Sequence, residues 1–344
     1  MKPVRRMAAL VGLGALLGFG ALAGARDTVA FASIPGRIVR LDPRFDALIA
    51  ADATLEPIAT GHQWVEGPAW EPRHQALYYS DIPANTVYRW EARAGVSAFL
   101  RPSGYSGSEP FSGREPGSNG LTFDPVGRLV LCEHGDRRIG RLEPDGRRSV
   151  IVDRYRGRRL NSPNDAVYAR NGDLYFTDPP FGLPGTFDDP ARELPFSGVY
   201  RLRRDGTLEL LIENLRAPNG IALSPDERTL YVTDVDADRP AWLAYEIDDD
   251  GVGARRVLAD ARPWTRLRRG GPDGLDADAH GNLFAAGPEG VFVFAPDGIL
   301  LGLIETGVPT ANVAWGEDGS TLFIAAATTI YRLRTQTRGA GWSR

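Results

Sequence analysis

Cysteine is almost absent from this sequence. Among 344 residues there is one, Cys132. A single thiol cannot form an intrachain disulfide, and it excludes a cysteine-based zinc site. Cys132 ends the apolar run 129–132, so we expect a buried small hydrophobic side chain in place of a catalytic thiol. A stable fold must then come from the hydrophobic core alone.

An excess of charge of one sign is also missing. The formal net charge is −4, and no basic cluster is interleaved with aromatic residues. The composition therefore predicts no nucleic-acid partner. The paired arginines are scattered along the chain, which is typical of solvated loops, and no feature predicts an obligate protein partner.

Histidine is scarce as well. The four histidines, His62, His74, His134 and His280, are spread over the chain. The sequence contains neither a Gly-x-Ser-x-Gly nucleophile elbow nor a His-Glu-x-x-His zinc motif. These absences argue against the hydrolase mechanisms that depend on those motifs. His74 and His280 fall in predicted turns, where we expect exposure to solvent.

Long apolar runs are missing except at the start of the chain. Residues 7–25 are apolar and small, and they follow Lys2, Arg5 and Arg6. This pattern predicts a signal peptide over residues 1–25, with cleavage near Ala25 and a periplasmic or secreted protein. An uncleaved anchor is the alternative, since about 19 apolar residues could just span a bilayer. The sequence leaves open which export route is used, and it predicts no other membrane contact.

Glycine and proline, in contrast, are abundant, at 40 and 26 residues. They divide the chain into six successive units, each with three or four short runs rich in Val, Leu, Tyr and Phe. Four-stranded units of about 40–50 residues are typical of a β-propeller, and no unit has helical periodicity over more than a turn or two. The sequence predicts an all-β, six-bladed β-propeller with four-stranded antiparallel blades around a central channel, over residues 54–335.

The same repeat predicts how the propeller begins and ends. Ring closure should place residues 54–60 beside a strand near 330–334. We expect residues 26–53 to form a loosely packed lead-in and the tail, 336–344, to be frayed. Long loops near a propeller mouth often cover a site, and two long excursions are expected there. They are Gly95–Glu115 and Pro179–Ser197.

One polar residue precedes the innermost predicted strand of almost every unit. The six equivalent positions are Glu66, Asn119, Asn164, Asn219, Asp273 and Ala311. Innermost strands line the channel, so these positions should share the rim of one mouth. Two carboxylates and three carboxamides offer only oxygen donors, which suit one hard divalent cation: Ca²⁺ first, with Mg²⁺, Mn²⁺ or Zn²⁺ as alternatives. Asn-Gly and Asp-Gly are also common turn dipeptides, so turn chemistry explains any single copy equally well.

Five segments together resemble the gluconolactonase and senescence-marker-protein family. They are Glu66–Trp70, Asn161–Asp165, Thr177–Pro180, Pro218–Ile221 and Pro272–Leu275. The resemblance covers most of the chain after residue 55. It implies a six-bladed propeller that holds one divalent metal in its channel and hydrolyses a small-molecule substrate, usually a sugar lactone.

The resemblance also implies roles for individual residues. The implied metal ligands are Glu66, Asn164, Asn219 and Asp273. Asn119 fits either a substrate contact or a position behind the metal ligands, and Asn164 and His134 are further candidate substrate contacts. Asn164 could be a metal ligand or a substrate contact. The segment Cys132–Arg138 resembles the bacterial members, although a structural hydrogen-bonding role for His134 stays open.

Lactone opening requires a polarised carbonyl and an activated water. A cation at the mouth would polarise the carbonyl, and Asp273, a ligand with a free oxygen, is the candidate general base. Two other functions stay open: a metal-dependent esterase or organophosphatase on the same site, and a non-enzymatic ligand-binding propeller. Asp81, Asp178 and Asp234 end the second strands of their units, where we expect turn or cap hydrogen bonds.

Overall fold

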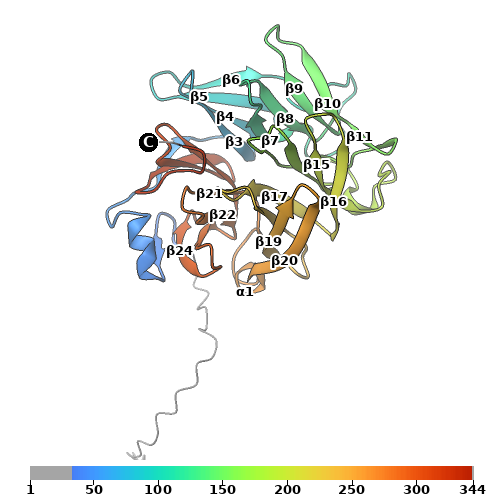
Figure 1. Cartoon of the computed structure of the whole chain (residues 1–344). Coiled ribbons are helices and arrows are strands. Elements are labelled where there is room, and N and C mark those ends of the chain that lie inside the picture. Colours follow the sequence, from blue (N-terminus) through green and yellow to red (C-terminus); the bar gives the residue numbers. More distant parts are fainter. Residues whose placement is uncertain (1–32, 343–344) are drawn as a thin grey trace, which may run out of the picture.

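The computed structural model describes residues 33–342, which form a ring of small antiparallel sheets (Figure 1). The predicted signal peptide lies outside the described residues. Six of the sheets have four or five strands each, and neighbouring strands within a sheet are mostly consecutive in the sequence. The prediction of a six-bladed β-propeller is therefore confirmed.

The first three blades follow one another along the chain. The first contains β3 (Val65–Glu71), β4 (Ala76–Asp81), β5 (Thr86–Glu91) and β6 (Gly95–Leu100). The second contains β7 (Ser118–Phe123), β8 (Leu129–Glu133), β9 (Arg138–Leu142) and β10 (Arg148–Val152), and a small ribbon of β11 (Arg154–Tyr155) and β12 (Arg158–Arg159) comes after it. The third contains β13 (Ala166–Tyr168), β14 (Leu174–Asp178), β15 (Ser197–Leu202) and β16 (Leu208–Leu215).

The remaining blades complete the ring. The fourth contains β17 (Pro218–Leu223), β18 (Thr229–Asp234), β19 (Ala241–Asp248) and β20 (Gly251–Asp260), and the short helix α1 (Arg262–Thr265) comes after it. The fifth contains β21 (Leu275–Ala277), β22 (Leu283–Gly287), β23 (Gly290–Phe294) and β24 (Leu300–Glu305), with β1 (Ile38–Arg40) on its outer edge. The sixth contains β25 (Thr310–Gly316), β26 (Thr321–Ala326), β27 (Thr329–Arg334) and β2 (Glu56–Ala59).

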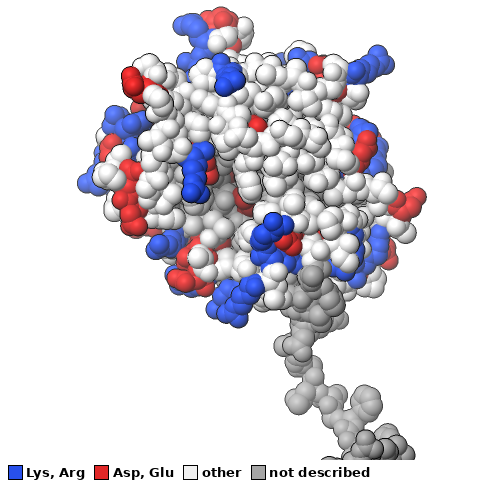
Figure 2. Space-filling view, turned by 180° about the vertical axis from the view of Figure 1, so that it is seen from behind, with Lys and Arg blue, Asp and Glu red and all other residues white. Residues whose placement is uncertain are grey.

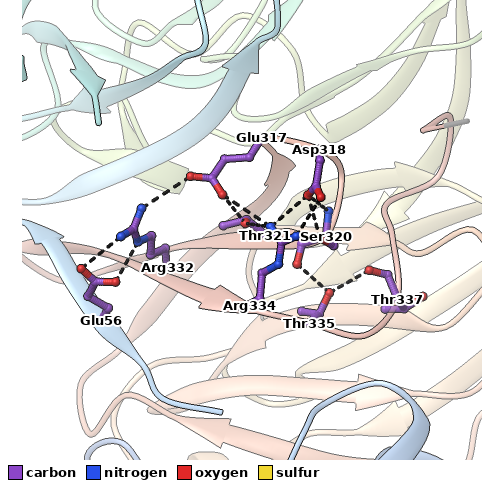
Figure 3. A network of polar contacts seen from close by, with 9 residues as sticks. All are labelled: Glu56, Glu317, Asp318, Ser320, Thr321, Arg332, Arg334, Thr335 and Thr337. Atoms are coloured by element: carbon purple, nitrogen blue, oxygen red, sulfur yellow. Dashed lines mark hydrogen bonds and ion pairs between the residues drawn. The ribbon is translucent and has the colours of Figure 1, made fainter. Parts of the chain in front are cut away.

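The sixth blade closes the ring with a strand from the other end of the chain. β2 pairs antiparallel with β27, and Glu56 lies opposite Arg332. Arg332 donates hydrogen bonds of 2.8 and 3.2 Å to the two carboxylate oxygens of Glu56 (Figure 3). The predicted closure is confirmed, and we call this β2–β27 junction, with Glu317 and Asp318 beside it, the seam.

The lead-in is more ordered than expected. β1 pairs with β24, so that Ile38 lies opposite Ile304 and the fifth sheet has an additional strand. The 3₁₀ helix η1 (Pro43–Ala47) follows, and Phe45 and Ile49 are fully buried between the fifth and sixth blades. The expectation of a loosely packed lead-in is therefore wrong for residues 33–53, and the rest of that segment lies outside the described residues. A three-residue strand and a single helical turn are too short to show a period in the sequence.

The tail is also packed, so the expectation that it frays is wrong for residues 336–342. The Thr337 hydroxyl donates to Asp278 at 2.8 Å, and Ala340 N–H donates to the Ala277 carbonyl at 2.9 Å. Trp342 then lines a channel cavity of about 430 Å³, together with Trp70 and other residues beyond the start of the innermost strands. Partial burial of Trp342 and the hydrogen bond of the Thr337 hydroxyl therefore attach a segment that looks polar in sequence.

The hydrophobic core is divided among the interfaces between blades. Six separate clusters of buried apolar side chains each join two neighbouring sheets. Between the sixth and first blades, Trp70 stacks on Phe323 with ring centroids 5.4 Å apart. Cys132 is buried in the cluster between the second and third blades, as predicted. Each blade is therefore held by its two neighbours, as expected for a closed repeat.

Two long loops project from the ring, and one is shorter than predicted. Residues 95–100 form β6, so the first loop covers only residues 101–117. The second, 179–196, contains the 3₁₀ turn η2 (Thr186–Asp188). No helix in residues 33–342 is long and apolar enough to cross a membrane. Figure 2 shows charged side chains of both signs spread mainly around the edge of one face, in accord with solvated loop charge.

Candidate active site

The innermost strands of the first three blades approach each other closely at their first residues. A Cβ on Gly67 would lie 2.3 Å from the Asn119 carbonyl oxygen. Gly120 N–H donates to the Asn164 carbonyl oxygen at 2.7 Å. Only glycine permits this approach of two backbones. The structure therefore places Glu66, Asn119 and Asn164 as neighbours on one ring.

The other half of the ring is built in the same way. A Cβ on Gly220 would lie 2.4 Å from the Asp273 carbonyl oxygen, and Gly274 N–H donates to the Ala311 carbonyl oxygen at 2.7 Å. Asn219, Asp273 and Ala311 are thus neighbours as well. All six positions chosen from the sequence lie around one channel mouth, which we call the mouth ring.

The two carboxylates of the mouth ring have no basic partner in the part of the chain that the structure describes. Burial raises the pKa of Glu66 to about 8, and the negative charges of Asp165 and Glu115 add to the effect. Burial also raises the pKa of Asp273 well above its usual range, followed by repulsion from Glu66 and Asp165. Without a counter-charge, burial and mutual repulsion therefore favour the protonated forms of these acids.

The amide side chains of the mouth ring are buried, and one of them has an oxygen without a hydrogen-bond partner in the described part of the chain. Asn119, Asn164 and Asn219 are 4%, 2% and 8% exposed. The Oδ1 atom of Asn119 has no hydrogen-bond partner among the described residues. A buried amide oxygen without a partner is unfavourable unless a ligand satisfies it.

This donor set fits a hard divalent cation. Carboxylate and amide oxygens are its preferred protein ligands, and two carboxylates would neutralise its charge. No point within residues 33–342 is surrounded by three or more His, Cys, Asp or Glu side chains. A site of two carboxylates and two amides is compatible with this, because amides supply half of the proposed ligands.

Two residues that sequence reasoning missed complete the mouth ring. The Asn312 side chain hydrogen-bonds both Glu66 and Asp165, so the sixth blade contributes through Asn312, the residue after Ala311. Asp165 is buried and accepts N–H groups of Ala166 and Ile221 at 3.0 and 3.3 Å. Asp165 directly follows Asn164, and Asn312 directly follows Ala311. Their position next to residues chosen from the repeat is the sequence signal that could have identified them.

His134 lies beside the mouth ring, under the two long loops. It is fully buried. Its Nδ1 is 2.8 Å from Oε2 of Glu115 in the first loop, and a Cβ on Gly182 in the second loop would lie 2.6 Å from the His134 Cβ. The Nε2 atom has no hydrogen-bond partner among residues 33–342.

Ser162 attaches the second loop to the third blade. Its hydroxyl donates to the Pro179 carbonyl at 2.6 Å and accepts the Gly182 N–H at 2.8 Å. The residue is fully buried. Ser162 therefore positions the loop over the site, and its hydroxyl is already used within the chain.

The three aspartates at the ends of second strands make backbone hydrogen bonds, as predicted. Each accepts N–H groups from the segment that leads into the innermost strand of its own blade. The pairs are Asp81 with Gln63 and Trp64, Asp178 with Asn161, and Asp234 with Ala217. These bonds fix the entry of three innermost strands and so hold the mouth ring in place. His74 and His280 are exposed, also as predicted.

The fold and the ring of oxygen donors place the chain in the class of six-bladed β-propellers with a candidate ligand site at one channel mouth. Within that class, the chain belongs to the SMP-30/Gluconolactonase/LRE-like region family, whose model matches residues 64–328. The family resemblance seen in the sequence is confirmed.

Several proteins named as lactonases are similar to this one over most of the chain. A gluconolactonase from Zymomonas mobilis is 43% identical over 311 residues, which cover 88% of this chain and 87% of that protein. A 6-deoxy-6-sulfogluconolactonase from Pseudomonas putida is 30% identical and aligns with 76% of this chain and 82% of its own length. The structure of a gluconolactonase from Xanthomonas campestris superposes with a TM-score of 0.76 at 34% identity, covering 90% of this chain and 100% of that one.

Proposed function

We propose that this protein is a divalent-cation-dependent hydrolase that opens a sugar lactone. The observation that carries the proposal is the mouth ring, where Glu66 and Asp273 are brought together with buried amides and without a basic partner. Membership of a family with gluconolactonase relatives supports the substrate class.

Four side chains of the mouth ring would hold the cation: Glu66, Asn164, Asn219 and Asp273. Ca²⁺ is the favoured ion because all four donors are oxygens, with Mg²⁺, Mn²⁺ or Zn²⁺ as alternatives. Once bound, the cation would polarise the lactone carbonyl and stabilise negative charge on its oxygen.

Asp273 is the proposed general base. It is only partly buried, and one oxygen accepts the Gly274 N–H at 3.1 Å while the other makes no hydrogen bond within the described residues. That second oxygen would take a proton from water as the water oxygen bonds to the carbonyl carbon. The ring C–O bond then breaks, and the proton passes to the departing oxygen to give the hydroxy acid. Asn119 and His134 are the proposed substrate contacts.

The decisive experiment combines metal analysis with hydrolysis. We expect purified protein to contain about one divalent ion per chain and to consume base in a pH-stat with glucono-δ-lactone. EDTA should abolish the activity, and added Ca²⁺ should restore it. Metal-free protein that keeps its full stability and has no lactonase activity would instead favour a non-enzymatic binding propeller.

We further propose that the protein is exported and acts in the periplasm or outside the cell. The proposal depends on the basic start and apolar run of residues 1–25. Cell fractionation followed by N-terminal sequencing checks it, and the expected mature start lies just after Ala25. Full-length protein in the cytoplasmic fraction would contradict it.

A further inference from the structure

Glu115 is an acidic residue near the mouth ring to which the proposed reaction gives no role. It ends the first long loop just before β7 and is partly exposed, with 34% of its side chain accessible. Oε2 is buried against His134 Nδ1 at 2.8 Å. No other contact of the Glu115 carboxylate to a donor is present in residues 33–342, so its second oxygen has no partner within the chain.

His134 lies directly against this carboxylate. The imidazole is fully buried, and the backbone of Gly182 blocks it from the side of the second loop. Gly135, the next residue, is equally confined, because a Cβ there would lie 2.5 Å from the Tyr105 Cβ and 2.6 Å from the Pro116 carbonyl oxygen. A buried and closely packed ring limits the positions open to the carboxylate beside it, and a specific contact requires such positioning.

The Glu115 carboxylate lies near the mouth ring. Glu115 stands four residues before Asn119, and the Gly117 carbonyl between them accepts the His134 N–H at 3.2 Å. In accord with this placement, its negative charge contributes to the raised pKa values of Glu66 and Asp273. Asp165, the other contributor to both, is committed to backbone N–H groups in the channel wall. Glu115 is therefore the acidic group that combines nearness to the proposed reacting centre with an unused oxygen and access to solvent.

We propose that Glu115 is a specificity-determining residue, whose unused carboxylate oxygen accepts a hydrogen bond from a hydroxyl group of a neutral polyhydroxylated lactone. The inference rests on the proposed function, because it names the substrate class of the same site. The fixed negative charge also disfavours lactones that carry a phosphate or sulfonate group. Neutral lactones with several hydroxyl groups are then the preferred class.

The test compares Glu115→Gln with Glu109→Gln, an exposed glutamate on the same loop, in Ca²⁺-loaded protein. Substrates are glucono-δ-lactone, its 6-phosphate, and δ-valerolactone, which has no hydroxyl groups. A hydrogen bond to a charged group predicts that Glu115→Gln raises KM for glucono-δ-lactone by about 10- to 100-fold with little change in kcat. KM for δ-valerolactone should stay unchanged, and discrimination against the phosphate ester should weaken. Glu109→Gln should match the wild type throughout.

A binding measurement separates this inference from the proposed function. Gluconolactam, which has the same hydroxyl groups but is not readily hydrolysed, is titrated into the Ca²⁺-loaded proteins by calorimetry. Weaker binding to Glu115→Gln by about tenfold or more supports the inference even if no lactone is turned over. Equal binding to wild type and Glu115→Gln, equal KM changes for hydroxylated and unhydroxylated lactones, or no lactam binding to the wild type would overturn it. Unchanged Ca²⁺ affinity and melting temperature show that Glu115→Gln is folded.

Discussion

The mouth ring and the seam use the same kind of residue in opposite surroundings. At the seam, Glu56 pairs with Arg332 at 2.8 Å and Asp318 with Arg334 at 2.7 Å (Figure 3). A hydrogen bond from Ser320 and the charge of Arg334 lower the pKa of Asp318. In the mouth ring, burial raises the pKa of Glu66 to about 8, and no arginine, lysine or histidine pairs with it among the described residues.

The presence or absence of a basic partner distinguishes acids that stabilise the fold from acids that are available to bind a ligand. The seam lies at the surface, where each carboxylate has a guanidinium within the chain and water around it. The mouth ring is buried apart from the partly exposed Asp273, and an unpaired carboxylate in such surroundings is costly unless something outside the chain compensates it. Perturbed acids without an internal partner are therefore a better indicator of a functional site than acidity alone.

Asp273→Asn should produce the largest effect. The amide can still coordinate a cation but cannot accept a proton, so kcat for a lactone should fall by about 10²- to 10⁴-fold with the cation bound. Stopped-flow or pH-stat assays, with metal content measured in parallel, check this. Asp318→Asn at the seam is the matched control and should keep wild-type kcat. Full activity of Asp273→Asn with cation bound would remove Asp273 as the base.

Glu66→Gln should weaken cation binding. The substitution removes one of the two negative charges of the mouth ring, and since even outer-sphere partners of metal ligands contribute about 10- to 100-fold in affinity, we expect a loss of roughly 100-fold. Calorimetric titration with CaCl₂ measures it. Glu317→Gln, which changes a seam carboxylate near Arg332, should leave the affinity unchanged. A Glu66→Gln protein that binds Ca²⁺ as tightly as the wild type would rule out the proposed ligand set.

The stability of the metal-free protein should fall as the pH rises, and a bound cation should oppose this fall. In metal-free protein the pKa of Glu66 is raised from 4.5 to about 8, so the folded state binds more protons than the unfolded state in this window. The free energy of unfolding must then fall as the pH rises from about 5 to 8. A cation binds the deprotonated acids, so it should stabilise the protein more at pH 8 than at pH 5.

Thermal melting in EDTA and in CaCl₂, at both pH values, checks this expectation. We expect the Ca²⁺-induced rise in Tm to be larger at pH 8 by on the order of 5 °C. Glu66→Gln should reduce that pH dependence, whereas Glu317→Gln should preserve it. Identical Ca²⁺ effects at pH 5 and pH 8 would mean that the mouth-ring acids are not the binding groups.

The fold could be predicted from the sequence because each blade is a local repeat. Short strands and their turns are encoded within about 50 residues, and the register of the repeat placed Glu66, Asn119, Asn164, Asn219 and Asp273 around one axis. In the sixth blade that register pointed to Ala311, but the side chain that reaches Glu66 belongs to Asn312. The Ala311 and Asn164 carbonyl oxygens accept equivalent hydrogen bonds, so the register itself was correct. Asn312 corresponds to Asp165, and the repeat alone does not show that the side chain after the chosen position also reaches the mouth.

Contacts made by loops and chain ends could not be predicted in this way. Glu115 reaches His134 because the loop 101–117 folds back onto the second blade, and the sequence gives no period from which to read that path. Similarly, β1 joins the fifth blade through three residues. Such contacts depend on the packing of distant segments, which local patterns do not determine.

The smallest effect is expected at the seam itself. Glu56 and Arg332 are 55% and 32% exposed at their side chains, so water screens their attraction and the pair should contribute only about 0.5 kcal/mol to the free energy of unfolding. We expect Glu56→Gln to lower it by that amount, less at high salt, and to leave kcat, KM and Ca²⁺ affinity unchanged. Denaturant titrations at 0.05 and 1 M NaCl measure the difference. A loss of several kcal/mol, or any loss of Ca²⁺ affinity, would show that the seam and the mouth ring are coupled. The seam acids would then not be purely structural.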